Sequence, residues 1–135
     1  MRAREQGNKE ESFVVLLATC DPQISEELNR TLHRKKVEIL TFDNARDMLF
    51  AIAEKRINLI VFDPDISGLK GLGILSVIKK FRPGTRVIAM GENLSFETQR
   101  ALANEGVLYQ IPKPMSPGQI SQVVETVVEK LYHHD

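Results

Sequence analysis

Short apolar runs alternate along this chain with segments whose apolar residues recur every three or four positions. The runs are too short for helices and rich in β-branched residues, so they predict strands at 13–18, 37–41, 57–62, 86–90 and 107–111. The first of them, at 13–18, is apolar at every position. Such a run is typical of a strand that is buried on both faces of a parallel sheet.

The segments between these runs predict five helices. Asp21 is expected to cap the first helix, with Pro22 at its first position, and Asp43 is expected to cap the second. The third helix follows the glycine-rich loop 68–73 and ends at the turn 81–84.

The fourth and fifth helices differ in how clearly the sequence marks them. The fourth, at 95–104, is poorly patterned, and Gly106 is expected to stop it. The fifth begins with capping-box spacing at Ser116, and Met115 can staple against Ile120. Its apolar residues form an unbroken stripe: Ile120, Val123, Val124, Val127, Val128 and Leu131.

Strands that alternate with helices predict an α/β fold whose five-stranded parallel sheet is covered by helices on both faces, with right-handed crossovers. Folds of this kind place their sites at the carboxyl ends of the strands. Those ends carry Thr19, Cys20 and Asp21, then Asp63, then Gly91 and Glu92, and finally Lys113.

Composition and charge limit the function classes. The 135 residues suit one domain, expected at 12–132 between a disordered leader at 1–11 and a tail at 133–135. The formal net charge is zero, so direct nucleic-acid binding is not expected. No apolar run approaches the roughly 18 residues that span a bilayer. One cysteine, Cys20, interpreted as a small buried residue, excludes an internal disulfide and favours a cytoplasmic location.

Several of these motifs occur together in one known family. An apolar strand ends in Asp63 and is followed by the loop 67–71, a fourth strand runs through 87–90, and Gly106 precedes Lys113 and Pro114 at a fixed interval. In order and spacing the chain resembles the receiver domain of bacterial response regulators over roughly residues 12–131. The resemblance implies a flavodoxin-like, doubly wound sheet of strand order 2-1-3-4-5 and a role in two-component phosphorelay signalling.

The resemblance also assigns roles to residues at the strand ends. Asp63 falls at the phosphoacceptor position, and Lys113 would hold a phosphoryl oxygen or pair with the carboxylate, with a cis peptide before Pro114. The family's two metal-binding acids fall on Thr19 and Cys20, neither of which is a carboxylate. A Mg²⁺ ion would therefore depend on Asp63, the backbone carbonyl of Asp65 and Asp21, and we expect weak binding at most. Asp21 fits a helix cap better than a metal ligand.

The family's switch positions are also altered. The switch hydroxyl falls on Gly91, and the switch aromatic falls on Gln110, with Tyr109 one residue early and aimed at the opposite face of the sheet. We therefore expect a degenerate receiver that acts by protein–protein interaction, with weak or absent phosphorylation at Asp63. The alternative is a working Mg²⁺-dependent phosphoacceptor that a histidine kinase or phosphotransfer protein phosphorylates on Asp63.

The expected partners are proteins. The resemblance implies a histidine kinase, a phosphotransfer protein or a downstream effector, and it leaves a homodimer open. The partner surface would be the face built from the fourth helix, the fifth strand and the fifth helix, with Arg100, Tyr109 and Gln119 expected among its exposed residues. A small-ligand site at the strand tips is less favoured, because no phosphate-binding glycine loop follows the first strand. No Ser/His/Asp or Cys/His set indicates an enzyme.

Overall fold

The computed structural model describes residues 13–33, 36–64, 66, 71–92, 94–113 and 118–132. The leader and tail predicted at 1–11 and 133–135 lie outside the described residues. So do the capping box at Ser116, the staple of Met115 and the cis peptide predicted before Pro114.

The strands form one parallel sheet in the order β2-β1-β3-β4-β5, which confirms the predicted fold class. Its central strand, β3, pairs with β1 and β4, and every residue of β3 is buried. This continuous burial explains why β3 reads as an unbroken apolar run. The five strands are β1 (Phe13–Ala18), β2 (Val37–Phe42), β3 (Leu59–Phe62), β4 (Arg86–Glu92) and β5 (Tyr109–Lys113).

Three predicted strands were wrong by two residues at one or both ends, and the fourth strand, expected at 86–90, continues to Glu92. The fifth strand was expected at 107–111 but begins at Tyr109, because the amide of Val107 donates to the carbonyl of Leu102 and still belongs to the end of the preceding helix. The third strand begins at Leu59, after Asn58, whose side-chain Oδ1 accepts from the amide of Val14 at 2.8 Å.

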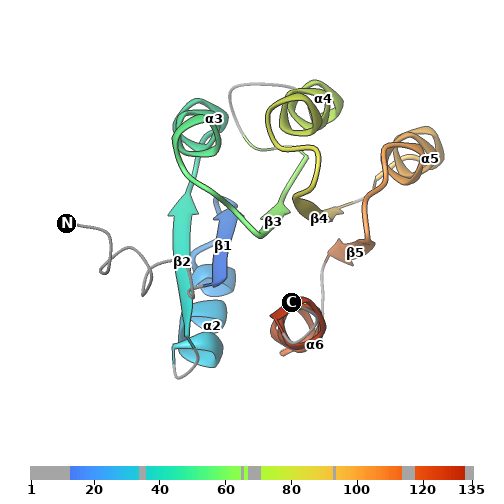
Figure 1. Cartoon of the computed structure of the whole chain (residues 1–135). Coiled ribbons are helices and arrows are strands. Elements are labelled where there is room, and N and C mark those ends of the chain that lie inside the picture. Colours follow the sequence, from blue (N-terminus) through green and yellow to red (C-terminus); the bar gives the residue numbers. More distant parts are fainter. Residues whose placement is uncertain are drawn as a thin grey trace.

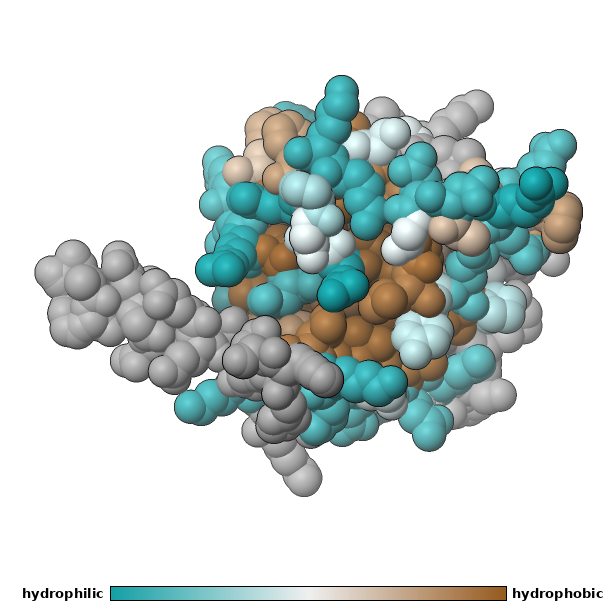
Figure 2. All heavy atoms as spheres, turned by 45° about the vertical axis from the view of Figure 1, so that its right-hand side comes forward, coloured by the Kyte–Doolittle hydropathy of each residue, from teal (hydrophilic) through white to brown (hydrophobic). Residues whose placement is uncertain are grey.

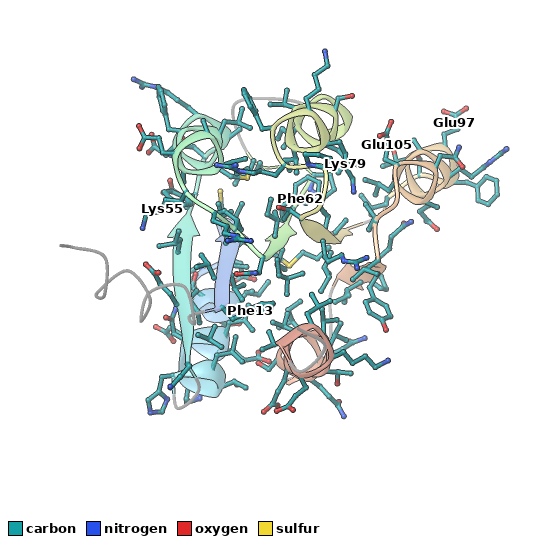
Figure 3. The ribbon with its side chains drawn as sticks, viewed as in Figure 1. Phe13, Lys55, Phe62, Lys79, Glu97 and Glu105 are labelled. Atoms are coloured by element: carbon teal, nitrogen blue, oxygen red, sulfur yellow. The ribbon has the colours of Figure 1, made fainter. Side chains whose placement is uncertain are left out.

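Helices cover both faces of this sheet (Figure 1). The helices α2 (Pro22–Leu32) and α6 (Gln119–Tyr132) cover one face, and α3 (Ala45–Glu54), α4 (Gly71–Phe81) and α5 (Phe96–Asn104) cover the other. Each face has its own apolar core: one includes Phe13 of β1, and the other includes Phe62 of β3. These two side chains lie on opposite faces of the sheet in Figure 3.

The helix caps confirm one sequence prediction and contradict another. Asp21 caps α2, since its carboxylate accepts from the amide of Gln23 at 2.9 Å. The cap of α3 is Asn44 and not Asp43: the Oδ1 atom of Asn44 accepts from the amide of Asp47 at 2.8 Å. Gly106 ends the fourth predicted helix with φ +87°, a backbone conformation that favours glycine.

Hydrophilic side chains frame a central apolar area on the face of the molecule drawn in Figure 2. Among the described residues, the large apolar side chains that remain exposed are Phe50, Phe81, Phe96, Leu108 and Tyr109. None of the described helices has the length and apolar character needed to cross a bilayer.

One polar contact links the two helices that share a face of the sheet. The hydroxyl of Ser121 in α6 donates to Oε2 of Glu27 in α2 at 2.6 Å, and Ser121 is only 6% exposed. We expect Glu27→Ala to lower the free energy of unfolding by about 1–3 kcal/mol, because a buried hydroxyl loses its charged acceptor. Urea unfolding followed by circular dichroism measures this change.

Glu26→Ala is the matched control, since Glu26 is the exposed neighbour in the same helix. It should change the free energy of unfolding by less than about 0.5 kcal/mol. Equal effects of the two substitutions would show that the contact between Glu27 and Ser121 adds nothing to stability.

Candidate functional site

Asp63 lies immediately after β3, at the carboxyl edge of the sheet. Its amide donates to the carbonyl of Ala18 at the end of β1 at 3.1 Å, and its carbonyl accepts from the amide of Ile66 at 3.0 Å. These two bonds fix the backbone on both sides of a half-buried carboxylate. The structure therefore places Asp63 at the strand tip where the sequence predicted it.

Lys113 reaches the same edge of the sheet by its backbone. It is the last residue of β5 and pairs in register with Glu92, the last residue of β4. The side chains of both residues, and all of Asp65, lie outside the described part of the structure. The contact between Asp63 and Lys113 and the metal ligand predicted at Asp65 therefore stay predictions.

The end of β1 carries the residues at the family's metal-binding positions. Thr19 is 3% exposed, and its Oγ1 accepts from the amide of Asp21 at 3.1 Å. The prediction that Cys20 is buried was wrong: its side chain is exposed, and Sγ lies 3.3 Å from the carbonyl of Asp43. The strand has already ended at Cys20, so this side chain points out of the core.

A hollow of about 400 Å³ opens between the tips of β1 and β2, and Asp63 does not line it. Three of its lining residues are aspartates, but each carboxylate already accepts a local hydrogen bond. Asp21 accepts from the backbone amide of Gln23, and Asp43 and Asp47 both accept from the side-chain Nδ2 of Asn44, at 2.9 and 3.1 Å.

The described residues at this edge do not by themselves form a cation site. Within the described residues, no group of three or more His, Cys, Asp or Glu side chains is arranged to hold a metal ion. Hard cations such as Mg²⁺ prefer oxygen ligands, whereas Cys20 offers a thiol and Thr19 keeps its oxygen for the amide of Asp21.

The end of β4 shows how the altered switch position is packed. Gly91 is buried, and a Cβ atom built on it would lie 2.7 Å from Cδ2 and 3.0 Å from Cγ of Leu94. Carbon atoms this close repel each other strongly, since contact begins near 3.5 Å. The half-buried side chain of Leu94 would therefore have to shift before position 91 could carry a side chain.

The altered aromatic position is held by hydrogen bonds. Nε2 of Gln110 in β5 donates to the carbonyl of Gln99 in α5 at 2.9 Å. Nε2 of Gln99 in turn donates to the carbonyl of Leu94 at 2.9 Å. A continuous chain of contacts, which we name the glutamine bridge, thus connects Gln110 through Gln99 to Leu94 and, by packing, to Gly91.

The residues expected on a partner surface lie at the α5, β5 and α6 side of the molecule. Tyr109 is 44% exposed and Arg100 is exposed, whereas Gln119 at the start of α6 is half-buried. The guanidinium of Arg100 lies 5.9 Å from the ring centroid of Phe96, which is 71% exposed. The exposure predicted for Arg100 and Tyr109 is confirmed.

Sequence reasoning missed Leu94 and Gln99. Leu94 is the one apolar residue between Gly91 and Ser95, and an apolar side chain within a polar loop is a signal that could have been followed. No local pattern reveals the bond between Gln99 and Gln110, because it depends on how α5 packs beside β5.

Comparisons with known proteins agree with this geometry. A family model described as the response regulator receiver domain matches residues 15–125. The DNA-binding transcriptional regulator NtrC of Azospirillum brasilense is 31% identical over 111 residues, which are 82% of this chain and 23% of that protein. The nitrogen assimilation regulatory protein NtrX of Azorhizobium caulinodans is 29% identical over 119 residues, 87% of this chain and 26% of that protein. The chain thus spans about a quarter of the length of these relatives.

Solved structures show the same fold. A CheY-like receiver domain protein from Methanospirillum hungatei JF-1 superimposes with a TM-score of 0.79 at 22% identity, over 92% of this chain and 99% of that one. A beryllofluoride-activated NtrC4 receiver domain dimer superimposes with a TM-score of 0.76 at 21% identity, over 88% and 98% of the two chains. With most of its residues matched by the family model, the chain belongs to the response regulator receiver domain family.

Proposed function

We propose that this chain is a receiver-like module of a cytoplasmic two-component phosphorelay that signals through protein–protein contact, with weak or absent phosphorylation at Asp63. The observation that carries the proposal is the packing of Leu94 into the space at Gly91. Gly91 is the position where the family pattern would place the hydroxyl that responds to a phosphoryl group. Without that hydroxyl, a phosphoryl group on Asp63 has no side-chain donor at this position.

The glutamine bridge supports the same proposal. A conformational switch needs an element with two arrangements of similar free energy. Here two side-chain amides connect β5 to α5 and α5 to the loop before it. These bonds stabilise one arrangement, so a signal at Asp63 would have to break them before β5 and α5 could move.

The donor set at the tip of β1 supports weak phosphorylation. Phosphoryl transfer depends on positive charge that neutralises the transferred oxygens. A missing carboxylate weakens the hold on a cation, since two unit charges at about 4 Å interact by roughly 4 kcal/mol at an effective dielectric near 20. We therefore propose that Lys113 supplies most of the positive charge beside Asp63, with little help from Mg²⁺.

The exposed side chains on α5 and β5 support a role in protein contact. Phe96 and Tyr109 present aromatic surface, and Arg100 adds a guanidinium beside Phe96. Aromatic residues and arginine are enriched where protein interfaces gain most of their binding energy. We propose this face as the docking surface for a kinase, a phosphotransfer protein, an effector or a second copy of the chain, and we assign the chain no enzymatic activity.

Adding one carboxylate near the tip of β1 should increase beryllofluoride binding and phosphorylation at Asp63. We expect the natural chain to bind beryllofluoride weakly in the presence of Mg²⁺. The Cys20→Asp variant should bind beryllofluoride at least about tenfold more tightly, because the substitution adds a carboxylate at an exposed position near the strand tip. Fluorine NMR of bound beryllofluoride measures the binding. Mass spectrometry after treatment with acetyl phosphate measures phosphorylation at Asp63.

Two variants make this experiment specific. Ser25→Asp adds the same charge within the same hollow, and it should leave binding within about twofold of the natural chain. Asp63→Asn should abolish any modification. Tight, Mg²⁺-dependent binding by the natural chain would refute weak phosphorylation and favour the working phosphoacceptor.

The packing at Gly91 gives a test based on stability. We expect Gly91→Ala to lower the free energy of unfolding by about 1 kcal/mol, because the new methyl group collides with Leu94. In a Leu94→Ala background the same substitution should be neutral or stabilising by about 0.5 kcal/mol, since the collision is gone and glycine costs backbone entropy. Chemical unfolding of the four proteins gives the coupling free energy.

Gly73→Ala is the matched control for this cycle. A Cβ atom on Gly73 meets nothing within 4 Å, so the substitution should stabilise α4 by up to about 1 kcal/mol with or without Leu94. If Gly91→Ala had the same effect in both backgrounds, Leu94 would not fill the space at position 91.

A further inference from the structure

A second hollow lies at the end of the sheet where the strands begin, opposite the carboxyl ends that carry Asp63. It has a volume of about 430 Å³ and opens among the connections that lead into the amino ends of the strands. Residues 56–58, just before β3, and 81–86, between α4 and β4, form most of its lining. The hydroxyl of Thr85 donates to the carbonyl of Ile57 at 2.9 Å, so the α3–β3 and α4–β4 connections are in contact here. Phe13 of β1 and Leu131 of α6 complete the wall.

Three arginines line this hollow: Arg56, Arg82 and Arg86. Arg82 has a structural role, since its Nε and Nη2 donate to the carbonyls of Ile52 and Ala53 at the end of α3, at 3.0 and 3.4 Å. Arg56 and Arg86 are exposed, and neither forms an ion pair with a described residue. No described acidic side chain lines the hollow.

Such an arrangement gives the hollow a positive potential that attracts anions. The lining residues carry three guanidinium groups, and among these lining residues there is no carboxylate to balance them. Arginine is also the side chain whose geometry best matches phosphate, with two parallel N–H donors. The charge at this edge therefore favours a phosphate or another multivalent anion.

The rest of the lining suits a ligand that is not purely ionic. Phe13 and Ile57 are buried, Leu131 is half-buried, and Phe81 at the rim is 54% exposed. Asn58 uses Oδ1 for the amide of Val14, and no described residue accepts from its Nδ2. The hollow thus offers an aromatic ring, an apolar wall and a side-chain amide next to three cationic groups.

We propose that this hollow binds a phosphate-bearing small molecule with a planar apolar body, such as a nucleotide. Its volume falls within the range of small-molecule sites, roughly 300–1,000 Å³. The phosphates would contact Arg56 and Arg86, and the planar ring would lie against Phe81. This site is independent of Asp63 and of the proposed signalling role, because the two lie at opposite edges of the sheet.

Titration of the full chain with ATP in magnesium-free buffer, followed by amide NMR shifts, tests the proposal. We expect saturable shifts at Arg56, Ile57, Thr85 and Arg86, and none around Asp63. Sodium triphosphate, adenosine and hexaglutamate should each bind at least about tenfold more weakly than ATP, because each lacks the ring or the phosphates.

The variant Arg56→Gln/Arg86→Gln should weaken ATP binding by at least about tenfold. Arg30→Gln/Arg46→Gln removes the same charge from exposed positions outside the hollow and should change binding by less than about twofold. Both double variants should keep the amide spectrum of a folded chain, since all four side chains are exposed.

Three results would overturn the proposal. One is the absence of saturable shifts up to about 10 mM ATP. Another is an equal loss of binding in the two double variants, which would indicate general charge attraction. The third is hexaglutamate or triphosphate binding as tightly as ATP, which would exclude a site for a nucleotide-like molecule.

Discussion

The packing of Leu94 against the bare backbone of Gly91 is the constraint on which the functional account depends. At this point β4 ends and the chain turns toward α5, beside the strand tip that carries Asp63. A leucine side chain fills the space above a glycine, so the position cannot carry a hydroxyl without repacking. Because Gln99 bonds the carbonyl of Leu94 and Gln110 bonds that of Gln99, the same leucine is connected to β5.

At the carboxyl edge of the sheet, several described side chains have structural roles. Asp21 caps a helix, Thr19 accepts a backbone hydrogen bond, and Asp43 and Asp47 both accept from the side-chain Nδ2 of Asn44. Each of these bonds stabilises a turn or a helix end. The exposed side chains on α5 and β5, which we propose as the docking surface, lie on the other side of β3 from these contacts.

Much of this fold could be predicted from the sequence because burial imposes a pattern. The apolar run that forms β3 is buried at every position. The apolar stripe of α6 packs into the core on one face of the sheet. The sequence also placed Asp63 and the cap at Asp21 correctly. It failed where two neighbouring residues offered similar chemistry, as with Asp43 and Asn44, and where a contact joins distant elements, as between Gln99 and Gln110. Local patterns carry no information on such packing.

The most direct test of the central claim is nitrogen-15 relaxation dispersion at the amides of Gly91, Leu94, Gln99 and Gln110. A switching receiver exchanges between two conformations in the microsecond-to-millisecond range, which dispersion detects. The account predicts flat profiles at all four amides, because the glutamine bridge and the packing of Leu94 stabilise one arrangement. Concerted exchange at these residues in the natural chain would contradict it.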